Sequence, residues 1–240
     1  MRVSIFVTCL VDQIRPEVGV AAVRVLRRAG CEVTFHAAQT CCGQPAWNAG
    51  YVDEARSVAR ALMAIYAAEK ADAIVVPSGS CTAMIRHLPE LFESPEEQSL
   101  ASSIAERTHE FVTFLVRRLG LLDLGACWTG KATWHDACHG LRDLGISDEP
   151  RSLMARVRGL ELVEAKRAQT CCGFGGTFSI KHPELSVAMA DEKLDEIESL
   201  GVRAIVSGDV SCLMHLGGRL ARRGSKVQAL HIAELLAAQE

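Results

Sequence analysis

The sequence Gln39-Thr40-Cys41-Cys42-Gly43 occurs a second time in the chain, as Gln169-Thr170-Cys171-Cys172-Gly173. The two copies are separated by 130 residues. Two further cysteine pairs keep nearly the same spacing, and these are Cys9 with Cys138 and Cys81 with Cys212. A repeat of this length indicates two copies of one structural unit. We therefore expect two related halves, residues 1–125 and residues 126–240.

Short β-rich runs alternate with amphipathic helical stretches in both halves. In the first half, we expect strands at Arg2–Val7, Cys31–Ala37 and Ala73–Val76, and helices at Pro16–Ala29 and Val52–Glu69. In the second half, we expect strands at Lys131–Trp134, Leu160–Val163 and Val202–Val206, and helices at Pro150–Val157 and Glu184–Leu200. Strands that alternate with helices form right-handed βαβ units around a parallel sheet. The expected fold is therefore α/β, with two duplicated Rossmann-like βαβ halves.

Eight of the ten cysteines belong to the repeat. They are Cys9, Cys41, Cys42 and Cys81 in the first half, and Cys138, Cys171, Cys172 and Cys212 in the second. They lie just beyond the carboxyl ends of the expected strands, at the edge where ligands bind in open α/β sheets. We therefore expect four thiols to meet at one point in each half. Cys31 and Cys127 have no counterparts, and we interpret them as ordinary core residues.

The composition is that of an ordinary soluble protein, with 49% hydrophobic residues, 23% charged residues and a net charge of −3. The paired arginines each precede a glycine, as at helix ends, so no nucleic-acid surface is expected. The apolar stretch Val3–Val11 fits a first core strand better than a signal peptide, and no membrane span is expected. We therefore expect a cytoplasmic protein. Disulfides are disfavoured in that reducing compartment, so the cysteines favour metal binding or redox chemistry.

Four thiolates in each half match the ligand set of a [4Fe–4S] cluster, which takes one cysteine for each iron. Gly43 and Gly173 permit the sharp turn that lets two adjacent cysteines reach two irons. Zinc also binds four cysteines, but zinc sites usually use C-x2-C pairs, which neither half contains. We therefore expect two iron–sulfur clusters, with zinc as the alternative. Residues Gly173–Gly176 match a dinucleotide fingerprint poorly, so neither NAD nor flavin is expected.

Two histidines, His135 and His139, lie on either side of Cys138. Their spacing of four residues would suggest metal ligation on a helix, but side chains at a strand end need not converge. His139 adjoins a cysteine of the repeat and is a candidate for a hydrogen bond to sulfur. We interpret His135, inside the expected strand, as a packing residue. No acid–base pair stands out, so no catalytic residue is assigned.

Three motifs carry a resemblance to a known family. They are Trp134–Arg142, Cys171–Ser179 and Gly208–His215. With the doubled Cys-Cys-Gly motif, the chain resembles the cysteine-rich CCG domain family over essentially its whole length. That family includes the cysteine-rich component of heterodisulfide reductase and the iron–sulfur component of glycolate oxidase. The closer likeness is to members that take part in lactate utilization.

The resemblance implies an iron–sulfur subunit of a complex that oxidises L-lactate, a small hydroxyacid, to pyruvate by electron transfer through its clusters. It implies two partners, a ferredoxin-like iron–sulfur protein and a small third subunit. It also assigns the four repeated cysteines of each half to one cluster. Two alternatives stay open, a zinc-stabilised structural or assembly protein and a thiol redox component like that of heterodisulfide reductase.

The chain departs from the fuller family pattern at Ser78 and Asp209. That pattern ends each repeat in C-x-x-C, and these two residues replace the first cysteine of each pair. Four thiolates in each half still suffice for an ordinary cube, but the five-thiolate cluster of heterodisulfide reductase is not expected. Asp209 could supply an oxygen ligand and leave one iron open to a hydroxyacid, which we state as a hypothesis.

Overall fold

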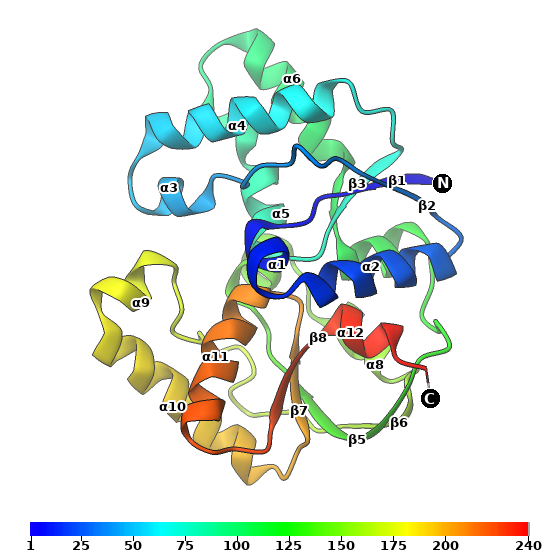
Figure 1. Cartoon of the computed structure of the whole chain (residues 1–240), viewed down its shortest axis with the longest axis vertical. Coiled ribbons are helices and arrows are strands. Elements are labelled where there is room, and N and C mark those ends of the chain that lie inside the picture. The colour runs from blue at the N-terminus through cyan, green and yellow to red at the C-terminus, as the bar shows by residue number, and fades with distance from the viewer. Residues whose placement is uncertain (240) are drawn as a thin grey trace.

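Two four-stranded parallel sheets form the framework of the computed structural model, which describes residues 1–239 (Figure 1). The first sheet has the order β2-β1-β3-β4 and contains β1 (Arg2–Ile5), β2 (Glu32–Phe35), β3 (Ala73–Val76) and β4 (Thr108–Glu110). The second has the order β6-β5-β7-β8 and contains β5 (Cys127–Trp134), β6 (Arg158–Leu162), β7 (Ala204–Ser207) and β8 (Gln228–His231). All the pairings are parallel. The expected α/β fold with two duplicated halves is therefore confirmed.

The sequence pattern does not reveal the fourth strand of either half. Strand β4 has the sequence Thr-His-Glu and β8 the sequence Gln-Ala-Leu-His, so neither is the continuous apolar run of a buried parallel strand. Each leads directly into a helix that its last residue caps. Glu110 caps α7 (Phe111–Thr113), and His231 caps α12 (Ile232–Ala237). Glu110 and His231 therefore occupy equivalent places in the two halves.

Helices connect the strands and cover the sheets. The first half contains α1 (Cys9–Ile14), α2 (Pro16–Arg28), α3 (Gln44–Asn48), α4 (Val52–Ala67), α5 (Gly79–Arg86), η1 (Leu88–Leu91), α6 (Pro95–Arg107), α7 and η2 (Phe114–Arg118). The second contains η3 (His139–Asp143), α8 (Asp148–Met154), α9 (Thr177–Lys181), α10 (Pro183–Ser199), α11 (Val210–Arg222) and α12. The four expected helices correspond to α2, α4, α8 and α10. Within residues 1–239, no helix combines the length and the apolar character that crossing a membrane requires.

Three helices that the sequence analysis did not predict begin directly after the central strands. They are α1 after β1, α5 after β3 and α11 after β7. Each has a polar N-cap whose side chain accepts a hydrogen bond from a backbone N–H of the first turn. The caps are Thr8 with Val11 N, Ser78 with Cys81 N and Asp209 with Ser211 N. Residues just beyond these strands therefore lie in helical first turns rather than in open loops.

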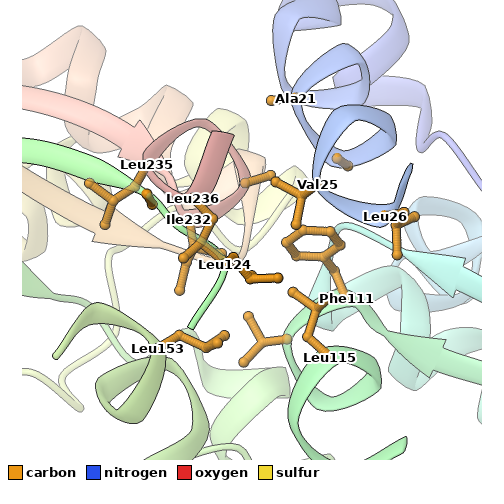
Figure 2. Packing of buried hydrophobic residues seen from close by; sticks show 14 of the residues in the cluster. Ala21, Val25, Leu26, Phe111, Leu115, Leu124, Leu153, Ile232, Leu235 and Leu236 are labelled. Atoms are coloured by element: carbon orange, nitrogen blue, oxygen red, sulfur yellow. The ribbon is translucent and has the colours of Figure 1, made fainter. Parts of the chain in front are cut away.

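The two halves share one buried apolar layer, shown in Figure 2. The first half contributes Val25 from α2 and Phe111 from α7, and the second contributes Leu153 from α8 and Ile232 from α12. All four side chains are fully buried. Burial of this kind stabilises by roughly 1.5–3 kcal/mol for each large apolar side chain, so the layer holds the two sheets in a fixed relation. The division of the chain between residues 125 and 126 stays a prediction.

Candidate metal centre

The repeated cysteines form one group in each half, at the carboxyl ends of the strands. The first-half thiols are Cys9 at the start of α1, Cys41 and Cys42 in the loop after β2, and Cys81 in the first turn of α5. The second-half thiols are Cys138 just before η3, Cys171 and Cys172 in the loop after β6, and Cys212 in the first turn of α11. In both groups, three separate segments of the chain bring the sulfurs together.

Each group contains pairs of sulfurs in contact. Among the first-half thiols, the Sγ atoms of Cys9 and Cys41 are 3.7 Å apart, and those of Cys42 and Cys81 are 3.4 Å apart. Among the second-half thiols, the Sγ atoms of Cys172 and Cys212 are 3.1 Å apart. All ten cysteines of the chain are free. Each half therefore brings repeated thiols from separate segments close together, while their role as metal ligands stays a prediction.

Both groups of thiols face the same cavity, which has a volume of about 600 Å³. All eight repeated cysteines line it, together with Ser78, His139 and Asp209. The shared apolar layer of Figure 2 produces this arrangement, because it holds the two sheets with their carboxyl ends toward one space. Cys31 lies in that apolar layer instead, and neither it nor Cys127 lines the cavity.

Hydrogen bonding lowers the pKa of one first-half thiol, Cys41, and of two second-half thiols, Cys171 and Cys212. Hydrogen bonds from neighbouring thiols lower the pKa of Cys41 and the pKa of Cys171 far below the ordinary value of cysteine. The pKa values of Cys42 and Cys172 are raised, because their protons are held between neighbouring sulfurs and both side chains are buried. Metals bind thiolates, and a bound cation displaces the remaining protons. The donor set of each group therefore fits a thiolate-ligated metal or cluster.

Glycines make the turns that hold the adjacent cysteines. Gly43 has a φ of +91° and Gly173 a φ of +90°, values that residues with a Cβ adopt only with strain. Their backbone N–H groups point back at sulfur, at 3.5 Å from Cys41 Sγ and 3.4 Å from Cys171 Sγ. Such N–H groups stabilise negative charge on sulfur. The sharp turn expected at both glycines is present.

Ser78 and Asp209, the two residues that depart from the family pattern, lie against each other between the halves. The Oδ2 atom of Asp209 accepts hydrogen bonds from the Ser80 N–H at 2.9 Å and from the Ser78 hydroxyl at 3.3 Å. Its Oδ1 atom accepts from the N–H of Ser211 at 3.2 Å and from the Ser211 hydroxyl at 2.5 Å. The Oδ2 atom therefore links α11 to α5, while the Oδ1 atom caps α11 itself. A role of Asp209 as an iron ligand stays a prediction.

Comparison with known proteins agrees with this arrangement of cysteines. The cysteine-rich CCG domain matches the chain twice, at residues 3–86 and 132–217. The chain belongs to the CCG cysteine-rich domain family.

Relatives of this CCG chain align with it over nearly their whole length. A protein named lactate utilization protein A from Geobacillus kaustophilus is 47% identical over 240 residues, which is 100% of both chains. A protein of the same name from Bacillus subtilis is 44% identical over 237 residues, covering 98% of this chain and 99% of the relative. Among solved structures, an Asp/Glu racemase homologue from Yersinia pestis aligns over 99% of this chain and 96% of its own, at 11% identity and a TM-score of 0.39. That likeness is too weak to inform fold or function.

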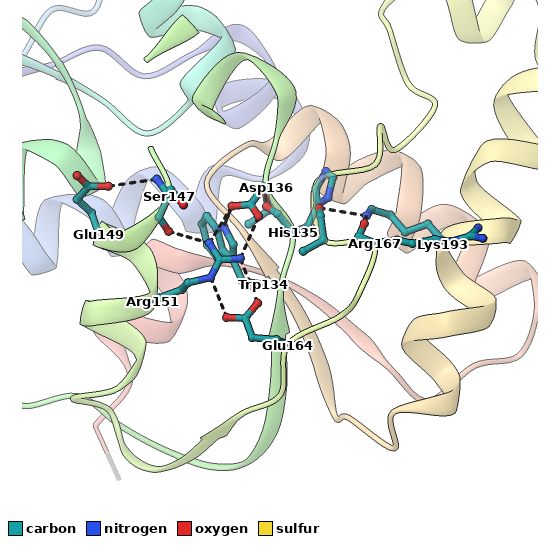
Figure 3. A network of polar contacts seen from close by, with 11 residues as sticks. Trp134, His135, Asp136, Ser147, Glu149, Arg151, Glu164, Arg167 and Lys193 are labelled. Carbon is teal, nitrogen blue, oxygen red and sulfur yellow. Dashed lines mark hydrogen bonds and ion pairs between the residues drawn. The ribbon is translucent and has the colours of Figure 1, made fainter. Parts of the chain in front are cut away.

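A polar network holds the loop of the CCG chain that carries Cys138 (Figure 3). The carboxylate of Asp136 is buried and accepts a hydrogen bond from Trp134 Nε1 at 2.7 Å. It also forms an ion pair with Arg151 at 2.9 Å, and Arg151 pairs in turn with Glu164 at 2.7 Å. The family motif around Cys138 therefore contains residues that position the cysteine without touching sulfur.

His135 lies beside the second-half thiols, which the sequence analysis did not anticipate. Its ring is 1% exposed, and neither ring nitrogen has a hydrogen-bond partner among the described residues. A ring nitrogen of His135 and the sulfurs of Cys172 and Cys212 all lie within 4.8 Å of one another. Alignment of the repeat would have signalled the difference, because the equivalent residue of the first half is Phe6.

His139 lies at the cavity but bonds to other groups. Its Nε2 atom is 3.2 Å from Gln44 Nε2 in the first half, and its Nδ1 atom is 2.6 Å from the carboxylate of Asp143. The two histidines around Cys138 therefore do not converge on one point, as expected for residues at a strand end. The hydrogen bond from His139 to sulfur stays a prediction.

Proposed function

We propose that this CCG chain is an electron-transferring iron–sulfur subunit of a system that oxidises L-lactate to pyruvate. The observation that carries the proposal is the convergence of all eight repeated cysteines, in two groups of four, on one cavity. The first-half thiols would hold one [4Fe–4S] cluster and the second-half thiols the other. The full-length relatives named lactate utilization protein A support lactate as the substrate of the system.

The chain supplies several groups that favour the negative charge of a thiolate-bound cluster. When bound, such a cluster provides one-electron redox chemistry. Helices α5 and α11 begin beside Cys81 and Cys212, so the positive ends of their dipoles lie at the sulfurs. The N–H groups of Gly43 and Gly173 add two donors to sulfur. Because ten free thiols persist in a reducing compartment, we place the system in the cytoplasm.

The rim of the cavity offers a place for a redox partner to approach. Trp47 in α3 is 41% exposed and Ile180 in α9 is 80% exposed. Ile180 itself lines the cavity, and so do Gln44 and Asn48 of α3. Exposed apolar residues of this size commonly mark interaction surfaces. We place the ferredoxin-like iron–sulfur partner at this rim, with the small third subunit as the other member of the system.

The deciding measurement is the content of iron and acid-labile sulfide, with an absorption spectrum, in protein purified without oxygen. Two cubes require about eight iron and eight sulfide for each chain. A variant in which Cys31 and Cys127 are both replaced by alanine is the matched control, and it should keep the full content. Wild-type protein with no sulfide would contradict the cluster assignment.

A zinc-stabilised structural protein is the second candidate, because within residues 1–239 His135, Cys172 and Cys212 form a group that could hold one metal ion. This candidate predicts a colourless protein with stoichiometric zinc and no sulfide. The same metal analysis therefore separates the two functions.

Lactate as substrate requires a test of its own. We expect the chain to restore growth on L-lactate when expressed in a Bacillus subtilis strain that lacks its lactate utilization protein A. A variant with Cys42 replaced by serine should not restore growth, because it removes a ligand of the first cluster. Failure of a chain that carries its full iron and sulfide would contradict the lactate assignment and leave the cluster assignment intact.

A further inference from the structure

The two groups of thiols have different surroundings, and the repeat allows a residue-by-residue comparison. Phe6 and His135 are equivalent, because each is the first residue after the central strand of its sheet. The N–H of Phe6 donates to Val75 O at 2.9 Å, and the N–H of His135 donates to Val206 O at 2.8 Å. The paired strands have the same register, since Ile5 lies opposite Val75 and Trp134 opposite Val206.

The side chains at this position meet different partners. Phe6 is fully buried in an apolar cluster and its ring lies 6.1 Å from the ring of Tyr66. His135 is equally buried but keeps both ring nitrogens free of partners among the described residues. A buried polar group without a hydrogen bond costs about 1–3 kcal/mol. An acceptor for the ring N–H of His135 would therefore stabilise the protein. The sulfurs of Cys172 and Cys212 lie within 4.8 Å of a ring nitrogen of His135 and are available as acceptors.

At two more positions near the thiols, an apolar residue of the first half corresponds to a polar or charged residue of the second. A Cβ on Gly43 would meet Met84 Cε at 3.8 Å, whereas a Cβ on Gly173 would meet His215 Nε2 at 3.4 Å. His215 therefore stands where the first half has a methionine, and its ring bonds the hydroxyl of Ser186 at 3.2 Å.

The third position is Lys193 in α10, which corresponds to Leu62 in α4. The Lys193 ammonium is buried and donates to the carbonyl oxygens of Arg167 and Ala168 at 2.6 and 3.2 Å (Figure 3). Burial lowers the pKa of Lys193, while the charges of Cys172 and Cys212 act in the opposite direction. Lys193 therefore places a buried cation under the loop that leads to Cys171 and Cys172, where the first half has an apolar side chain.

His135 and Lys193 both favour a higher reduction potential in the second half. The Asp209 carboxylate near Cys212 acts against them, with its oxygens held by hydrogen bonds from Ser80 and Ser211. A cluster with four thiolates is negatively charged and becomes more so when reduced. N–H donors and a buried cation stabilise that additional charge, whereas apolar surroundings do not. A cluster among the second-half thiols is thus easier to reduce than one among the first-half thiols.

We propose that the second half holds the cluster of higher reduction potential and that His135 sets the difference as a hydrogen-bond donor to sulfur. With a cluster bound in each half, electrons that enter the cavity would collect in the second half. The transfer would move one electron and no atom, the first cluster being oxidised as the second is reduced. The proposal rests on the proposed function, because it requires a cluster in each half.

The test is a potentiometric titration followed by electron paramagnetic resonance, on anaerobic protein whose iron and sulfide content has first been measured. Wild-type protein should show two separate midpoint potentials. The variant His135→Phe, which introduces the first-half residue, should lower the higher potential and leave the lower one in place. We expect at least a tenfold fall in the reduced-to-oxidised ratio of that cluster at fixed potential, equal to about 59 mV for a one-electron couple.

Three further variants keep the result interpretable. Cys42→Ser removes the first cluster and so assigns the potentials to the halves. Lys193→Met, which keeps the volume of the side chain, should lower the same potential as His135→Phe. His87→Phe changes an exposed histidine at the far end of α5 that does not line the cavity, and it should alter neither potential. Two equal potentials, or a His135→Phe variant with both clusters and unchanged potentials, would overturn the proposal. Absence of iron and sulfide in the wild type would instead contradict the proposed function.

Discussion

The two halves agree in their backbone and differ in the side chains around their thiols. Strand order, parallel pairing, cysteine positions and the φ values of Gly43 and Gly173 are the same in both. The apolar residues Phe6, Leu62 and Met84 of the first half correspond to His135, Lys193 and His215 of the second. The comparison teaches that the duplicated framework fixes where the thiols meet. Single side chains around them then give each site its own properties.

A second difference lies where the halves meet. Glu110 and His231 end the fourth strands and cap the following helices in equivalent ways, but one is an acid and the other a base. Both are completely buried, and neither takes part in an ion pair of the described structure. The two positions are therefore expected to respond to pH in opposite directions.

The largest expected effect comes from removing one thiol in each half. Cys42→Ser and Cys172→Ser should each lose about half of the iron and sulfide, because each removes a buried ligand of one cluster only. If the halves are independent as metal sites, the double variant should lose all of it. Metal analysis and paramagnetic resonance spectra of the three proteins measure this. Loss of all iron in either single variant would show that the thiols form one joint site instead of two.

The next effect concerns pH and is about 3 kcal/mol at each position. Burial raises the pKa of Glu110 from 4.5 to about 7 and lowers the pKa of His231 from 6.5 to about 4. The raised carboxyl pKa contributes stability that is present below pH 4.5 and is lost as pH rises to 7. The lowered imidazole pKa contributes stability that is present above pH 6.5 and is lost as pH falls to 4. A shift of about 2.5 units corresponds to roughly 3 kcal/mol.

Variants at the two positions separate these contributions. Relative to the wild type, Glu110→Gln should gain about 3 kcal/mol of stability as pH rises from 4.5 to 7. His231→Gln should lose about the same amount of stability relative to the wild type as pH rises from 4 to 6.5. Urea unfolding across this range measures both differences. If both variants gained stability relative to the wild type as pH rises, or both lost it, the two caps would not differ as expected. The expected difference is that folding favours the protonated form of Glu110 and the deprotonated form of His231.

Much of the framework was accessible from the sequence, for a physical reason. The central strands β3 and β7 are buried on both faces and read as apolar runs, and the cysteine spacing marks the repeat. The edge strands β4 and β8 escaped detection because they are short and end in the polar caps Glu110 and His231. Both polar residues cap the helix that follows. A search for the apolar runs of buried strands therefore does not find these two strands.

The site was predictable in its ligands but not in its surroundings. Convergence of four thiols follows from the topology of a parallel sheet, whichever side chains surround them. The single cavity depends on how two halves pack, and no local pattern encodes that contact. His135 was interpreted as a packing residue because it was taken to lie inside the expected strand. Its buried ring does pack, but its position beside Cys172 and Cys212 becomes visible only when the loops after β6 and β7 are placed.

A smaller difference is expected between the two glycine turns. Gly43→Ala should cost about 1–2 kcal/mol, because its positive φ is strained for alanine while the nearest atom to the new Cβ is 3.5 Å away. Gly173→Ala has the same strain, and its Cβ would also lie 2.5 Å from Ser186 O. Such overpacking adds about 1–3 kcal/mol. Thermal unfolding of the two variants checks the order, and equal losses would show that the second loop can relax away from Ser186.

The smallest effect tests the contact between the halves. Asp209→Ser introduces the residue that the first half has at this place, and serine still caps a helix. It does not reach the Ser80 N–H of the other half, so we expect a loss of about 1–2 kcal/mol from one unmet donor and a full content of iron. The matched control is Ser94→Ala, which removes the half-buried cap of α6 and costs about 1 kcal/mol without involving the other half. Loss of iron from Asp209→Ser at unchanged stability would instead identify Asp209 as a ligand, and would make the second site different in its first coordination sphere as well as in its surroundings.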